Sequence, residues 1–327
     1  MKAPLVKAGA FLFVLYFYWS ITSINLPSEK SPVILYANQS GDELKKVILS
    51  ALSRTKSSLF LQIYGCTDSA VIHSIQNAQK RGVSTSIFYD PSGSGSLNKK
   101  ITGAIALHRR GLMHKKILVL DKERVFIGST NLTPTSLCMH DNTILGFHSK
   151  ELGHDILHSV AQHTSYSIGG QTIDLWHLPD QKHACIKRVL DLLSSAKKTI
   201  HIAMFTFTHP DILKSLEQAQ KQGVEVKVAL DYSSSVGASA TTVEFLQKKK
   251  IPLYIGAKGK LLHHKWCLID EKTLILGSAN WTKSAFRINE DCLLVVSDLT
   301  KKQKKQFQRI WSKIEKTSSK KENITQR

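Results

Sequence analysis

Apolar and polar residues alternate along this chain in the same order in each half. Apolar side chains recur three and four positions apart at 42–55 and again at 182–196, which predicts an amphipathic helix in each half. Short apolar runs at 58–64 and 199–206 predict buried strands after these helices. Further strands are expected at 83–89, 116–120 and 124–128 in the first half and at 224–230, 265–269 and 273–277 in the second. Alternating helices and strands predict an α/β fold with helices packed on both faces of its sheets.

The two halves are copies of one another. The segment AQKRGV at 78–83 matches AQKQGV at 219–224, and HKKILVLD at 114–121 matches HHKWCLID at 263–270. The offset between the copies is 141 residues for the first match and 149 for the second, so the second copy has gained eight residues between them. A single repeat of this length predicts two homologous domains rather than a solenoid.

The N-terminal segment differs from both copies. An uncharged apolar run at 8–24 follows Lys2 and Lys7, an order typical of an export signal and nearly long enough to span a bilayer. A cleaved signal and an uncleaved anchor both remain open, and either places the catalytic body outside the cytoplasm. A linker rich in His, Ser and Gly, at about 149–173, joins the copies. We therefore expect a signal peptide or membrane anchor at 1–27, a first domain at 28–160, a second domain at 161–315 and a basic disordered tail at 316–327.

The composition of the chain says more about its binding partners than about its fold. The 327 residues include 45 Lys and Arg against 25 Asp and Glu, a net charge of +20. Such an excess favours polyanionic partners: nucleic acid, an acidic membrane surface or a phosphate-bearing substrate. A hydrophobic content of 42% excludes wholesale disorder. The five cysteines are odd in number and form no CxxC pair, so neither a disulfide framework nor a zinc site is indicated.

Each copy contains the pattern His-x-Lys-x4-Asp, followed seven residues later by Gly-Ser-x-Asn. The residues are His114, Lys116, Asp121, Ser129 and Asn131 in the first copy, and His263, Lys265, Asp270, Ser278 and Asn280 in the second. Residues two apart in a strand face the same side, so each copy presents an imidazole and an ammonium group together.

Phosphodiester chemistry requires such a set. Cations and hydrogen-bond donors stabilise the charge of the transition state, and Ser and Asn add neutral donors. One imidazole can attack phosphorus, while a second, protonated imidazole gives a proton to the leaving oxygen. Because Lys116 and Lys265 supply positive charge, we expect neither a metal ion nor a cofactor.

These paired motifs resemble the double HKD motif of the phospholipase D superfamily, over about residues 30–315. The resemblance implies two α/β/α sandwich domains related by a pseudo-twofold, with one active site between them in a monomer. It implies that His114 is the nucleophile and that His263 is the general acid and then the general base. The phosphoryl oxygens would be bound by Lys116, Lys265, Asn131 and Asn280. Asp121 and Asp270 would be structural or orienting, since they follow at the far end of the strand.

The family also places a carboxylate downstream to orient a histidine. In the second copy Asn289 and Glu290 match this position, and the equivalent pair in the first copy is His140 and Asp141. We therefore expect Glu290 and Asp141 to support the histidines. Asp141 is one methylene shorter, so its hold on a histidine would be weaker.

The resemblance implies a metal-independent phosphodiesterase that acts through a covalent phosphohistidine. We favour hydrolysis or transfer of the phosphatidyl group of phospholipids, because a basic surface and an exported or anchored location suit anionic lipid and association with a membrane. A nuclease of the same superfamily, acting on DNA or RNA, fits the positive charge equally well. A phosphatidyltransferase similar to cardiolipin synthase is the third alternative.

Overall fold

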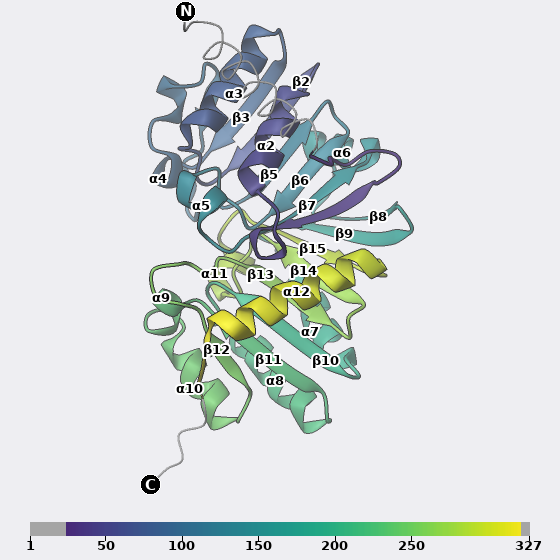
Figure 1. Ribbon diagram of the computed structural model, residues 1–327, viewed down its shortest axis with the longest axis vertical. Helices are drawn as coiled ribbons and strands as arrows, with labels where there is room; N and C mark the ends of the chain where they lie inside the picture. Colours follow the sequence, from purple (N-terminus) through teal and green to yellow (C-terminus); the bar gives the residue numbers. More distant parts are fainter. Residues whose placement is uncertain (1–23, 322–327) are drawn as a thin grey trace, which may run out of the picture.

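The protein, described by a computed structural model over residues 24–321, contains two large β-sheets that lie face to face (Figure 1). The first sheet has seven strands in the order β1-β7-β6-β5-β2-β3-β4. Its strands are β1 (Val33–Ala37), β2 (Ser58–Ile63), β3 (Ser84–Tyr89), β4 (Ala104–Ala106), β5 (Lys116–Leu120), β6 (Arg124–Gly128) and β7 (Thr143–His148).

The second sheet has nine strands in the order β16-β12-β11-β10-β13-β14-β15-β9-β8. Its strands are β8 (His163–Ile168), β9 (Gln171–His177), β10 (Thr199–Met204), β11 (Glu225–Leu230), β12 (Leu253–Ile255), β13 (Lys265–Ile269), β14 (Thr273–Gly277), β15 (Cys292–Val296) and β16 (Ser319–Lys321). The repeat is visible in the pairing. β2 lies parallel to β3 and antiparallel to β5, just as β10 lies parallel to β11 and antiparallel to β13.

Helices cover both faces of the sheets, as the sequence predicts. The outer faces pack against α2 (Leu44–Ser53), α3 (Ser69–Lys80) and α5 (Pro134–Cys138) in the first half, and against α7 (Ala184–Ser195), α8 (Pro210–Lys221), α10 (Ala240–Lys248) and α11 (Lys283–Arg287) in the second. The inner faces pack against α6 (Lys150–His158) and α12 (Lys301–Thr317). The short helices α4 (Pro91–Ser94), α9 (Tyr232–Ser235), η1 (Asn38–Ser40) and η2 (Leu97–Lys99) lie in connecting segments.

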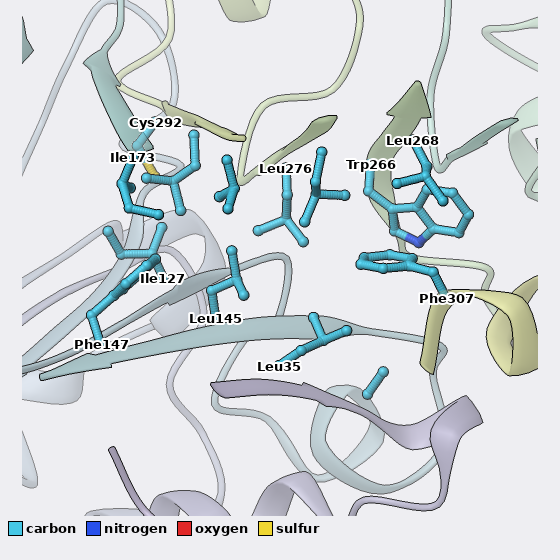
Figure 2. Packing of buried hydrophobic residues seen from close by; sticks show 14 of the residues in the cluster. Leu35, Ile127, Leu145, Phe147, Ile173, Trp266, Leu268, Leu276, Cys292 and Phe307 are labelled. Carbon is cyan, nitrogen blue, oxygen red and sulfur yellow. The ribbon is translucent and has the colours of Figure 1, made fainter. Parts of the chain in front are cut away.

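A single apolar cluster joins the two halves. Its side chains come from the inner faces of both sheets, so neither inner face is exposed to water. Figure 2 shows one row from the first sheet and α12 facing a second row from the second sheet. The labelled members are Leu35, Ile127, Leu145, Phe147, Ile173, Trp266, Leu268, Leu276, Cys292 and Phe307. This shared core holds the two copies of the motif at one interface.

The less regular segments contain more secondary structure than the sequence indicated, and the expected disorder of the tail from 316 is wrong. The linker at 149–173 contains helix α6 and most of a hairpin, β8 and β9, which extends the second sheet beyond β15. The tail was expected to be disordered from 316, but α12 continues to Thr317 and β16 pairs antiparallel with β12. The reason is that β12 would otherwise expose an unpaired sheet edge.

The expected apolar segment at 8–24 lies almost wholly outside the described residues, as do residues 322–327. Within residues 24–321, no helix combines the length and the apolar character that crossing a bilayer requires.

Candidate active site

The two motifs lie at equivalent strand starts and approach one another across the interface. Strand β5 begins at Lys116 and β13 begins at Lys265, so each histidine precedes its strand by two residues. The backbone N–H of His114 donates to the carbonyl of Glu290 at 2.7 Å, and the N–H of Asp141 donates to the carbonyl of Leu261 at 2.9 Å. Each motif is therefore held by main-chain bonds to the opposite half.

His114 is oriented by a carboxylate of the second half. Its Nδ1 lies 2.8 Å from Oδ1 of Asp291, which is fully buried. The hydroxyl of Ser278 donates to the same oxygen at 2.6 Å. Because an ionised carboxylate can only accept, the proton of the imidazole lies on Nδ1 and the Nε2 lone pair is free.

His263 is oriented by an amide of the first half. Its Nδ1 lies 2.9 Å from Oδ1 of Asn142, which also accepts from the hydroxyl of Ser129 at 2.8 Å. The other end of the amide donates from Nδ2 to the carbonyl of Ser136 at 2.9 Å. That carbonyl can only accept, so the amide oxygen must face His263. The proton on Nδ1 is fixed here as well.

The expected supporting residues are wrong by one position. Glu290 pairs with Arg109 at 2.6 Å instead of a histidine, and Asp141 pairs with Lys260 at 2.6 Å. The physical reason is that successive side chains in extended backbone point to opposite sides, so a shift of one residue reverses the direction. The repeat could not separate the two choices, because Asn142 and Asp291 are 149 positions apart and so are Asp141 and Glu290.

The two lysines lie beneath the histidines. The ammonium of Lys116 donates to the carbonyl of His114 at 2.7 Å and lies 5.2 Å from the ring centre of Tyr64. Lys265 repeats the arrangement with the carbonyl of His263 at 3.2 Å and the ring of Phe205 at 5.1 Å. Both lysines are buried, so burial lowers the pKa of Lys116 to about 7 and lowers that of Lys265 well below its usual value.

The same burial and the same cations act on the imidazoles. Burial and the neighbouring Lys116 lower the pKa of His114, although the carboxylate of Asp291 opposes the shift. Burial together with Lys265 and Lys116 lowers the pKa of His263 well below 6.5, and no carboxylate partner compensates. The site thus contains four buried basic groups, and a bound anion would stabilise their protonated, charged forms.

The two asparagines of the Gly-Ser-x-Asn segments line the same region. Oδ1 of Asn131 accepts from the N–H of Gly65 at 3.2 Å, and Oδ1 of Asn280 accepts from the N–H of Thr206 at 3.3 Å. These bonds orient each amide so that its Nδ2 group remains available as a donor. Within residues 24–321 neither Nδ2 group has a hydrogen-bond partner.

Asp121 and Asp270, which the sequence places in the same motif, lie outside the site. Each follows the far end of its strand, where its carboxylate accepts from three consecutive backbone N–H groups at the start of a neighbouring strand. Asp121 binds residues 56–58, and Asp270 binds residues 197–199. These aspartates are structural and touch neither histidine.

Sequence reasoning also missed two carboxylates that position the histidine loops. Asp90 accepts from the N–H of Met113 at 2.9 Å, and Asp231 accepts from the N–H of Leu262 at 2.9 Å. Each is buried and bonds to the residue immediately before a motif histidine. The signal was available, because both aspartates follow equivalent strands, β3 and β11, at the 141-residue offset.

Comparison with known proteins identifies the class. The family model described as "Cardiolipin synthase, PLD-like domain" matches residues 48–163 and 189–311, which is most of the chain. The chain therefore belongs to the phospholipase D superfamily, a class of phosphodiesterases. Its structure resembles the crystal structure of phosphatidylserine synthase from Haemophilus influenzae with a TM-score of 0.72 at 12% identity, covering 92% of this chain and 90% of that one. This likeness supports the two-domain fold.

Curated relatives are more similar in sequence but are matched over less of their length. The mitochondrial cardiolipin hydrolase of Mus musculus is 27% identical over 134 residues, which are 40% of this chain and 60% of that protein. The phospholipase D of Rickettsia bellii is 31% identical over 114 residues, 35% of this chain and 56% of that protein. The chain thus spans less than two thirds of these two relatives.

Proposed function

We propose that the protein cleaves the phosphodiester of a phospholipid headgroup, passing the phosphatidyl group through His114 to water or to an alcohol. One observation carries the proposal: two buried imidazoles meet at one interface, each with Nδ1 fixed by the opposite half and each above a lysine. The names of the relatives, a cardiolipin hydrolase and a phospholipase D, support a lipid substrate.

The first half of the reaction uses both histidines. Nε2 of neutral His114 attacks phosphorus, a nitrogen–phosphorus bond forms, and the bond from phosphorus to the headgroup oxygen breaks. Protonated His263 gives its Nε2 proton to that oxygen, so the alcohol leaves neutral. The lysine ammonium groups and the asparagine Nδ2 groups offset the charge on the phosphoryl oxygens, so the proposed mechanism needs no metal ion.

In the second half, His263 acts as a base. It takes a proton from water, the water oxygen attacks phosphorus, and the bond to His114 breaks, which restores the starting state. An alcohol in place of water gives transfer instead of hydrolysis.

Asp291 supports His114 as the nucleophile. The phosphorylated imidazole keeps its Nδ1 proton and bears a positive charge, and a carboxylate 2.8 Å away stabilises that charge. Asn142 gives His263 orientation without a charge, so His263 loses its proton more readily.

A trapping experiment tests the proposal. The His263→Ala variant is mixed with a phosphatidyl ester of p-nitrophenol, whose leaving group needs no acid, in EDTA. We expect one equivalent of nitrophenol and a phosphatidyl adduct on His114 by mass spectrometry, because the base for hydrolysis is missing. His114→Ala is the matched control and should give neither.

Three outcomes would overturn parts of this proposal. An adduct on His263 in the His114→Ala variant reverses the roles of the histidines. Loss of wild-type turnover in EDTA contradicts metal independence. Cleavage of single- or double-stranded nucleic acid without turnover of phosphatidylcholine or cardiolipin replaces the lipid substrate with a nucleic acid.

A further inference from the structure

Exposed apolar side chains surround the mouth of the site. Six large apolar side chains are exposed among the described residues. Three of them lie on loops that also carry site residues, and a fourth follows the short helix α9, which begins directly after Asp231. They are Leu112, Met139, Val236 and Ile288, with exposed fractions of 40%, 57%, 68% and 47%. Burying such side chains in an apolar environment is favourable, so four on one edge indicate a partner with an apolar layer.

The repeat places two of these residues symmetrically. Met139 follows α5 and Ile288 follows α11, at positions 149 residues apart. Each lies three residues before the side chain that orients a histidine, Asn142 or Asp291. Val236 follows α9, and in Figure 1 α5, α9 and α11 lie along the same edge of the molecule.

Cations flank these apolar side chains in both halves. The segments 109–112 and 258–261 precede the two motif histidines and are equivalent in the repeat. In each, one cation is paired across the interface: Arg109 with Glu290, and Lys260 with Asp141. The second cation, Arg110 or Lys258, is exposed and has no ion pair within residues 24–321.

A cavity opens beside this edge. It has a volume of about 520 Å3, and its lining includes Arg110, Leu112 and Ile288 from the two halves. A phosphate-bearing group with an apolar portion fits such a lining, because cationic and aliphatic side chains are adjacent.

We propose that four of the exposed apolar residues and the two unpaired cations form a rim that docks the site onto the surface of an anionic phospholipid bilayer. The rim consists of Arg110, Leu112, Met139, Val236, Lys258 and Ile288. Its aliphatic side chains enter the boundary between headgroups and acyl chains, and its two unpaired cations meet lipid phosphates. The inference rests on the proposed function in naming phospholipid as the partner. Aliphatic side chains favour a bilayer over nucleic acid, which is bound through cations and aromatic stacking.

Vesicle partitioning tests the rim. Both sheets and their cores lie within residues 24–321, so the chain from residue 24 to 327 is used, which removes the apolar N-terminal run. It carries His114→Ala to prevent turnover and is sedimented with vesicles of phosphatidylglycerol and phosphatidylcholine. Combined Met139→Ser and Ile288→Ser substitutions should lower partitioning about 10- to 100-fold. The Val236→Ser substitution should also lower partitioning.

The chain offers a matched control for each part of the rim. Val160 is 56% exposed but lies between α6 and β8, away from the mouth, so Val160→Ser should leave partitioning unchanged. Combined Arg110→Gln and Lys258→Gln should weaken binding more than the equal charge change Lys301→Gln with Lys305→Gln. Those two lysines lie on the first turns of α12, at the opposite side in Figure 1.

The outcomes separate the rim from the proposed function. Equal losses in the rim and control variants, or rim-dependent binding of single-stranded DNA without binding of vesicles, would overturn the rim. With His114 restored, the Met139→Ser and Val236→Ser variants, whose side chains do not line the cavity, should hydrolyse the water-soluble diester bis(p-nitrophenyl) phosphate like the wild type. Rim-dependent partitioning without any turnover of vesicle lipid would support the rim and refute the lipid substrate.

Discussion

The side chains that orient the two histidines differ in charge. His114 faces the carboxylate of Asp291, whereas His263 faces the amide of Asn142, although the two partners are equivalent in the repeat. The two contacts therefore share their geometry, but only one of the two partners carries a charge. A charge difference between otherwise equivalent sites is what separates a nucleophile from an acid.

Exchanging these partners should move opposite limbs of the pH profile. The carboxylate of Asp291 acts to raise the pKa of His114, so Asp291→Asn lowers that pKa further. His114 must be neutral to attack, so the acid limb of kcat/KM moves to lower pH, and the rate falls roughly 10²–10⁴-fold as the charge on phosphohistidine loses its partner. Asn142→Asp adds a charge beside His263, raises its pKa and moves the alkaline limb to higher pH.

The two limbs make the assignment of roles testable. Profiles of kcat/KM for a soluble diester are measured for both variants and for the double variant. If Asn142→Asp moved the acid limb instead, His263 would be the nucleophile.

The catalytic residues could be predicted from the sequence, but the side chains that orient the histidines could not. His114, Lys116 and their counterparts could be predicted, because a motif repeated at a fixed offset is improbable by chance. The sequence could not show which of two adjacent residues orients each histidine, because the direction of a side chain depends on the register of the backbone across the interface. Glu290 and Asp291 are both acidic, and only the paired backbone of Met113 and Glu290 decides between them.

Among the elements, the hairpins that follow the histidine strands explain the aspartate of the motif. Asp121 and Lys122 have φ of 53° and 62°, and the equivalent Asp270 and Glu271 have φ of 52° and 54°. The N–H of Glu123 and that of Lys272 close these turns onto the carbonyls of Leu120 and Ile269. A turn with positive φ at both central positions matches the twist of an antiparallel pair, and Asp tolerates that conformation. The same carboxylate binds the backbone at the start of strand β2 or β10.

Asp121→Ala should therefore lower stability without changing the chemistry. The loss of a charged acceptor for several N–H groups costs about 1–3 kcal/mol in the free energy of unfolding, measured in urea. Values of kcat/KM should stay near the wild type well below the midpoint of unfolding. Asp121→Asn keeps the turn and an acceptor oxygen, and should lose less.

The pH dependence of this stability follows from the pKa. Partial burial acts to raise the pKa of Asp121, but hydrogen bonds from Ser57, Lys56 and Ser58 outweigh it and hold the pKa below 3.8. A depressed pKa means that the contribution is present above the unfolded value and is lost as the pH falls through the folded one. The difference in stability between wild type and Asp121→Ala should thus shrink on acidification. A large fall in kcat/KM at neutral pH would instead place Asp121 in the chemistry.

The elements that the sequence predicted are those with a strong period. Helices α2 and α7 and strands β2, β5, β10 and β13 follow apolar patterns that local packing requires. The hairpin of β8 and β9 was missed because its strand His163–Ile168 buries only Tyr166 and Ile168 and exposes His163, Ser165 and Ser167. Strand β16 was missed because its three residues are polar and show no apolar pattern.

For the whole molecule, the site and the core depend on the same interface. Each histidine is held by the opposite half, and the largest shared apolar cluster contains side chains from both sheets. Separating the halves would expose that cluster to water and leave the carboxylate of Asp291 buried without its histidine. We therefore expect the two halves to stay associated and active after the chain between them is cut.

Cleavage of the connecting segment tests this dependence. A protease site inserted after Val160, which is exposed between α6 and β8, allows the folded chain to be cut after purification. The two fragments should elute together in size-exclusion chromatography and keep most of the activity toward a soluble diester, because the shared core and the crossed histidine contacts remain. The same insertion left uncut is the control. Fragments that separate under native conditions, or a first fragment that is active alone, would show that the interface is not what holds the site together.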